Sequence, residues 1–107
     1  MASVTLARID ENVRAAGISR AAFAIVCGVK PSTLSAAYNS IVNLGGPREA
    51  ELLTASYRLV ELRSACEPFA LPSNANMVRV LVNRLQDGTL SVEAIREMVS
   101  SLFEVTQ

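Results

Sequence analysis

The side chains that most often carry out catalysis are scarce in this chain. Its 107 residues include no histidine and two cysteines, Cys27 and Cys66, which lie 39 positions apart. Without histidine there is no Ser-His-Asp or Cys-His nucleophile and no imidazole metal site. Two distant cysteines cannot build a structural zinc site. We therefore expect a protein that is not an enzyme and that uses no metal and no cofactor.

The elements that position the remaining polar side chains are expected to be helices, because apolar residues recur at steps of three and four. This pattern predicts helices at about residues 6–16, 20–27, 31–40, 47–65, 77–86 and 92–103. Gly17, Gly28 and the pair Asp87-Gly88 mark turns between them. In the fourth helix the expected inner stripe consists of Ala50, Leu53, Tyr57 and Val60.

The length is that of one domain, and composition indicates where it functions. The first ten residues lack a basic region followed by an apolar run, so no secretory signal is expected. The longest uninterrupted apolar run, residues 21–27, is far shorter than the roughly 20 residues of a membrane span. We expect a cytoplasmic protein with reduced cysteines and no membrane partner.

Residues 20–39 have the pattern of two short helices that cross at a tight turn. Ala24 is small enough for a second helix to pass close by, and Gly28, four positions later, tolerates the positive φ of the turn. Val29, directly after the turn, is apolar and is expected to fill the core between the two helices. Leu34 and Ala37 then point back toward the first of the two helices.

The pattern extends beyond these two helices. The pair Tyr38-Asn39, a loop over residues 40–46 and the pair Leu52-Leu53 follow in order. Over residues 4–65 the chain resembles the phage repressor family (Cro/lambda-repressor-like, Xre-type). The resemblance implies an all-α fold, with a lambda-repressor-like helix-turn-helix bundle of four helices plus a C-terminal helical hairpin. The predicted divisions are a DNA-binding unit at 1–65, a linker at 66–76 and the hairpin at 77–107.

The resemblance also implies roles for individual residues. Arg20, the first residue of the second helix, is expected to reach DNA. The start of the recognition helix is expected to meet base edges, and its end and the following loop to meet backbone phosphates. Short hydroxyls and amides can approach the major groove, and basic side chains neutralise phosphates. The DNA-binding residues expected in this way are Arg20, Lys30, Ser32, Thr33, Ser35, Asn39, Ser40 and Asn43.

The sequence therefore predicts a small, sequence-specific DNA-binding transcriptional regulator of phage or mobile-element origin, with double-stranded DNA as its partner. Residues 1–40 carry four basic and two acidic side chains, although the whole chain has a net charge of zero. That neutrality favours an alternative, a protein-interaction module on a helix-turn-helix scaffold, such as an antitoxin-like or host-factor-inhibiting phage protein.

The predicted C-terminal hairpin has more apolar side chains than one face of a helix pair can bury. We expect residues 77–103 to form a homodimer contact, because a large exposed apolar patch is unusual on a monomer. The alternative is that this surface folds back on the other helices as a packing element. The residues concerned are Val78, Val80, Leu81, Met98, Val99, Leu102 and Phe103.

Overall fold

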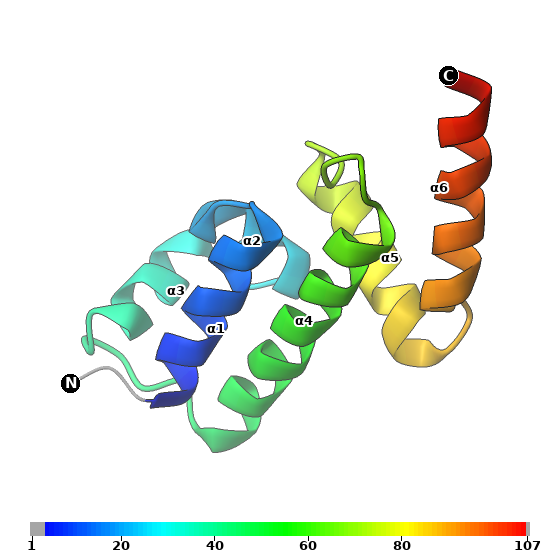
Figure 1. Ribbon diagram of the computed structural model, residues 1–107. Helices are drawn as coiled ribbons and strands as arrows, with labels where there is room; N and C mark the ends of the chain where they lie inside the picture. Colours follow the sequence, from blue (N-terminus) through cyan, green and yellow to red (C-terminus); the bar gives the residue numbers. More distant parts are fainter. Residues whose placement is uncertain (1–3, 107) are drawn as a thin grey trace.

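The computed structural model describes residues 4–106, apart from the side chains of residues 103, 105 and 106. Within these residues every regular element is a helix, which confirms the predicted all-α class (Figure 1). None of these helices is long and apolar enough to cross a membrane. In chain order the helices are α1 (Val4–Ala16), α2 (Arg20–Cys27), α3 (Pro31–Tyr38), α4 (Gly46–Ala65), α5 (Ala75–Asp87) and α6 (Val92–Thr106).

The helix ends follow from side chains that satisfy the free backbone groups. Ser19 caps α2 by accepting a hydrogen bond from the N–H of Ala22, and Asn74 caps α5 by accepting from the N–H groups of Asn76 and Met77. Pro31 lies in the first turn of α3, where a missing N–H costs least. The third helix ends at Tyr38, two residues before the predicted end, because Ser40 adopts a left-handed φ of 61°.

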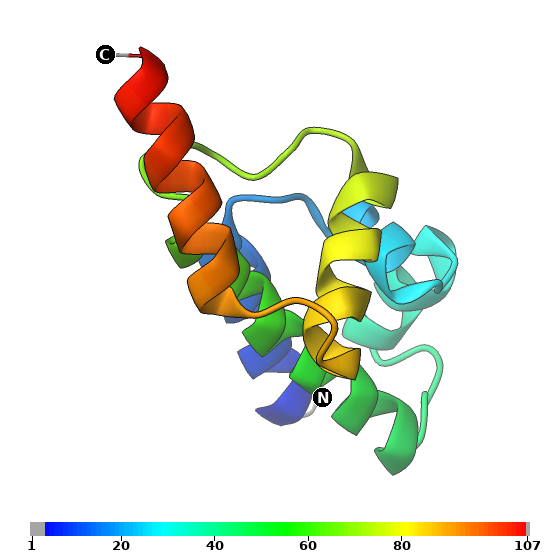
Figure 2. The ribbon, with the colours of Figure 1, turned by 90° about the vertical axis from the view of Figure 1, so that its right-hand side faces the viewer.

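The core lies around α4, which packs along α1 on one side and against α5 and α6 on the other. In turn, α5 packs on α2, and α3 packs on α2, so α2 lies between its neighbours and connects α3 to the bundle. Figure 2 shows α6 crossing α4 and extending past the rest of the bundle at its C-terminal end. The molecule is consequently about twice as long as it is wide, measuring 49 × 24 × 21 Å.

The predicted inner stripe of α4 is wrong. Tyr57 is exposed, as is Ala50, and Leu53 and Val60 are only partly buried. The buried residues are Leu52, Ala55, Ser56, Leu59, Leu62 and Ala65. Both sets repeat every three or four residues, so either satisfies the helical period. What decides between the two sets is the position of α1, α5 and α6, which pack against the side of α4 that carries the buried residues.

A buried polar pair joins α1 to α4 within this core. The side-chain amide of Asn12 donates to the hydroxyl of Ser56 at 3.0 Å, and that hydroxyl donates to the carbonyl of Leu53 at 2.7 Å. Ser56 is fully buried. Because a buried polar group that loses its partner is costly, this pair favours one register of α1 against α4.

The predicted C-terminal hairpin is partly core. Val78, Val82, Leu85 and Ile95 belong to the same buried cluster as Ile9 and Phe23, and the main contacts of α5 and α6 are with α2 and α4. Val78, assigned above to the dimer contact, is therefore buried, because α5 folds back over α2. Met77, Val80, Met98 and Leu102 remain about half exposed. The side chain of Phe103 lies outside the described residues.

Two valines on α5 test this packing. Val78 is 2% exposed and Val80 is 50% exposed. We expect Val78→Ala to lower the free energy of unfolding by about 2 kcal/mol, since it removes two buried methyl groups and leaves a cavity. Val80→Ala is the matched control, with little change expected when the chain is diluted so far that no second copy is bound. Urea unfolding followed by circular dichroism measures both, and equal effects would contradict the burial of α5 in the common core.

Candidate nucleic-acid interface

The segment from α2 to α3 is built around the turn at Gly28. Gly28 has a φ of 70°, a left-handed conformation that side chains with a Cβ rarely adopt. The N–H of Val29 then donates to the carbonyl of Ala24 at 2.9 Å, and the Val29 side chain is buried. Ala24, Leu34 and Ala37 are buried as predicted. The turn thus holds α2 and α3 in fixed relative positions.

The exposed face of α3 carries short polar side chains. Ser32 and Ser35 are exposed, and Asn39 is exposed at the C-cap. These positions repeat at steps of three and four, so they lie on one face, opposite Leu34. We call Ser32, Ser35 and Asn39 the polar stripe of α3. Thr33 lies outside this stripe and is only partly exposed.

The residues at the two ends of α3 have different surroundings. Lys30 precedes the helix, is exposed and makes no side-chain capping bond. At the other end, the N–H of Ser40 donates to the carbonyl of Ala37, which closes the helix. The side-chain oxygen of Asn43 accepts from the N–H of Gly45 at 2.8 Å. Asn43 is a predicted contact residue, and this oxygen stabilises the loop.

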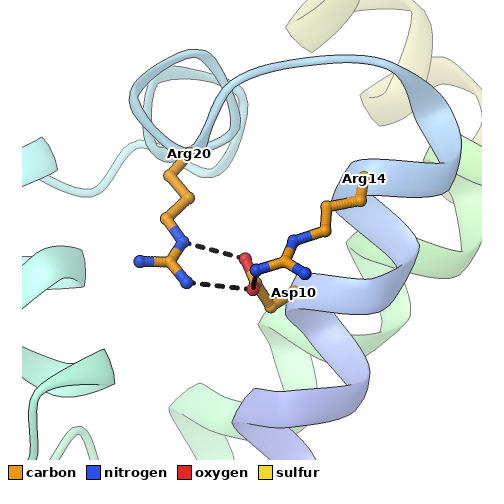
Figure 3. Close-up of polar contacts among 3 residues, drawn as sticks. All are labelled: Asp10, Arg14 and Arg20. Atoms are coloured by element: carbon orange, nitrogen blue, oxygen red, sulfur yellow. Dashed lines mark hydrogen bonds and ion pairs between the residues drawn. The ribbon is translucent and has the colours of Figure 1, made fainter.

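Arg20 of α2 is held in place by residues of two other helices, α1 and α3. Its Nε and one terminal nitrogen donate to the two carboxylate oxygens of Asp10 in α1, both at 2.9 Å (Figure 3). Its guanidinium also lies over the ring of Tyr38, 4.4 Å from the centroid, at the end of α3. Arg14 contacts the same carboxylate at 3.0 Å. A flexible cation at the start of α2 therefore has a defined direction.

The charges of this group stabilise one another. The hydrogen bonds from Arg20 lower the pKa of Asp10, and the carboxylate in turn raises the pKa of Arg20. The carboxylate is thus ionised at neutral pH while it bonds to both arginines. Together the two guanidiniums and one carboxylate have a net charge of +1.

The structure brings four of the eight predicted contact residues to one side of the molecule. Tyr38 directly precedes Asn39 and lies three residues after Ser35, so it borders the polar stripe of α3. Because Arg20 lies on the Tyr38 ring, Arg20 flanks that stripe too. Lys30, Thr33, Ser40 and Asn43 lie around it, at the two ends of α3 or on its flank. DNA contact by all eight stays a prediction.

The sequence analysis did not assign Asp10, Arg14 or Tyr38 to the contact surface, although Tyr38 was part of the pattern that carried the resemblance. The spacing of Asp10 and Arg14, four positions on one helix, was a visible signal of a surface ion pair. The bond from Arg20 to Asp10 had no such signal. It joins α1 to α2 across a turn, and only the packing of these helices decides whether the two side chains meet.

The cysteine at the end of α2 offers no reactive thiolate to this surface. Burial raises the pKa of Cys27 to about 12, so the thiol is neutral at physiological pH. Burial also raises the pKa of Cys66. Both cysteines act as small, partly buried side chains. What this surface offers chemically is hydrogen bonding and positive charge.

Comparison with known proteins finds no matching family model, no matching curated protein and no matching solved structure. The function is accordingly inferred from the residues and geometry described above.

Tyr38 provides a test of the geometry around Arg20. Its hydroxyl is buried and has no hydrogen-bond partner among the described residues, and burial raises its pKa to about 12. A phenylalanine keeps the ring beneath Arg20 and removes the unpaired hydroxyl. We expect Tyr38→Phe to be at least as stable as the wild type, by up to about 1–2 kcal/mol.

The matched control is Tyr57→Phe, because Tyr57 is the exposed tyrosine and its substitution should leave stability unchanged. Thermal and urea unfolding of both variants provide the measurement. A marked loss of stability in Tyr38→Phe alone would mean that the hydroxyl is bonded in solution and that this corner packs differently.

Proposed function

We propose that the protein is a small, sequence-specific DNA-binding transcriptional regulator, in which α2, the Gly28 turn and α3 act as a lambda-repressor-like helix-turn-helix unit. The observation that carries the proposal is the polar stripe of α3 with a fixed arginine at its edge. In this function α3 enters the major groove, and Arg20 and Lys30 contact phosphates beside it.

The side chains of the stripe suit this task. The hydroxyls of Ser32 and Ser35 can donate to and accept from base edges, and they are short enough to let the helix backbone approach the groove closely. Asn39, at the end of α3, is expected to contact a backbone phosphate. No arginine or glutamine in α3 is available for bidentate contact with a base. DNA shape is therefore expected to contribute to specificity as well.

We also propose that the regulator acts as a homodimer. One recognition helix covers only part of a turn of DNA, and two-fold pairing over a palindromic site is the usual way to reach useful specificity. The half-exposed side chains of Met77, Val80, Met98 and Leu102 provide apolar area that a second copy would bury.

A second candidate is a protein-interaction module on the same scaffold. The observation in its favour is the apolar loop beside α3, where Ile41 is 74% exposed and Val42 is also exposed. Exposed apolar side chains next to the polar stripe are more typical of a protein partner than of a phosphate backbone. Together with the net charge of zero, they give this candidate a physical basis.

DNA binding separates the two candidates. We expect the full chain to select a duplex sequence from a random library and to bind it with an affinity that falls steeply with salt, because bound cations are released from the phosphates. Ser35→Ala should reduce the preference for the selected over a scrambled duplex by about 1–3 kcal/mol. Fluorescence anisotropy over a salt series measures both effects.

Ser64→Ala is the matched control, because Ser64 is exposed at the far end of α4, and it should leave the preference unchanged. If the wild type binds no duplex at low salt, the regulator is excluded and the interaction module becomes the better candidate.

The dimer is tested by charge on α6. Leu102→Glu places a carboxylate on α6 one turn from Met98, where both side chains are more than half exposed, so we expect it to convert a wild-type dimer to a monomer in analytical ultracentrifugation. Ser101→Glu adds the same charge at the neighbouring exposed position and should remain dimeric. A wild-type chain that sediments as a monomer over the micromolar range would overturn the proposed dimer.

A further inference from the structure

Two arginines and one carboxylate form a compact charged group between α1 and α2. One oxygen of Asp10 accepts from a terminal nitrogen of Arg20 at 2.9 Å and lies 3.0 Å from a terminal nitrogen of Arg14. The two guanidiniums therefore converge on a single oxygen atom. Figure 3 shows them on either side of the carboxylate. An anion that reaches one guanidinium here is close to the other.

The positive charges lie outside and the negative charge lies behind them. The side chain of Asp10 is only 13% exposed, whereas those of Arg14 and Arg20 are 75% and 52% exposed. An approaching anion consequently meets guanidinium before it meets carboxylate. The partly buried carboxylate is shielded from bulk water and from the anion by the arginines that it binds.

The two guanidiniums differ in freedom. Arg20 is fixed by two bonds to Asp10 and by the Tyr38 ring, and its remaining terminal nitrogen points away from Asp10 (Figure 3). Arg14 is bound through one terminal nitrogen and is mostly exposed. The group thus combines a guanidinium with a fixed orientation, that of Arg20, and a guanidinium that can reorient, that of Arg14. A fixed donor loses less conformational entropy when it binds.

We propose that Arg14 and Arg20, positioned by Asp10, form a clamp for one backbone phosphate of the bound DNA. This inference rests on the proposed function and adds Arg14 of α1 to the contact surface, with Asp10 as a positioning residue. Planar guanidiniums with paired N–H groups match the oxygens of a phosphate. The clamp borders the polar stripe of α3, because Arg20 lies over the ring of Tyr38 at the edge of that stripe. A helix in the major groove has a phosphate backbone along its side, which is where the clamp would lie.

The substitution Arg14→Gln, which removes one positive charge and keeps a polar side chain, tests the clamp in the full chain. Binding is measured by anisotropy on the selected duplex and on a scrambled duplex over a salt series. We expect weaker binding to both duplexes by the same factor, with the salt slope reduced by about one, as the loss of one phosphate contact requires. The matched control is Arg8→Gln on the same helix, where Arg8 pairs with Glu11 at 3.2 Å. It should keep the wild-type slope.

Asp10→Asn tests the positioning role. The amide has nearly the shape of the carboxylate but removes one negative charge and releases Arg20. We expect binding to the scrambled duplex to rise, because repulsion from the phosphates falls, while the ratio of selected to scrambled affinity drops at least several-fold. A purely structural role would change stability and leave this ratio unmoved. Circular dichroism melts confirm that each variant is folded before its binding is compared.

The outcomes separate the clamp from the proposed function. If the wild type binds DNA and Arg14→Gln keeps the full salt slope, the clamp is overturned and the regulator stands. If the wild type binds neither duplex at low salt, both are overturned. If Arg14→Gln weakens the binding of polyglutamate and leaves DNA binding unchanged, the arginines serve a carboxylate partner and the phosphate clamp is again overturned.

Discussion

Two helices of eight residues each carry the candidate interface, and neither is long enough to be stable in water by itself. Their positions depend on burying Phe23 and Ala24 from α2 and Leu34 and Ala37 from α3. That burial needs partners on both sides, which α1, α4 and α5 supply. The rest of the architecture follows from this requirement. The long helix α4 supports α1, and α5 covers the outer side of α2.

The dependence on α5 explains why the C-terminal third cannot be treated as an appendage. Val78, Val82 and Leu85 belong to the same core as Ile9 and Phe23. Arg79 of α5 also lies beside Gly28, where a Cβ at that glycine would be 3.2 Å from its guanidinium. A cation there faces the negative end of the α2 dipole. The last two helices therefore stabilise the surface that we propose contacts DNA, whether or not α6 also pairs with a second copy.

Electrostatics at this surface is local rather than global. The chain is neutral overall, yet Asp10 holds two arginines beside the polar stripe of α3. Net charge sets long-range attraction, but contact with one phosphate depends on the few guanidinium groups within reach of it. A neutral protein can accordingly present a positively charged surface patch, and the partly buried carboxylate of Asp10 fixes the orientation of its arginines.

The sequence by itself determined the local structure, because its signals act within a few residues. The apolar period predicted each helix of the described residues, and Gly17 and Gly28 marked the turns before and after α2. It also predicted correctly that Ala24, Leu34 and Ala37 are buried between α2 and α3, since their spacing allows one inner face. It could not choose between two equally periodic stripes on α4, nor foresee that Val78 is core. Both depend on which helices lie alongside. Only the tertiary structure joined Arg20 to Asp10 and Tyr38, because a side-chain bond between helices forms when packing brings their ends together, and no local pattern encodes that distance.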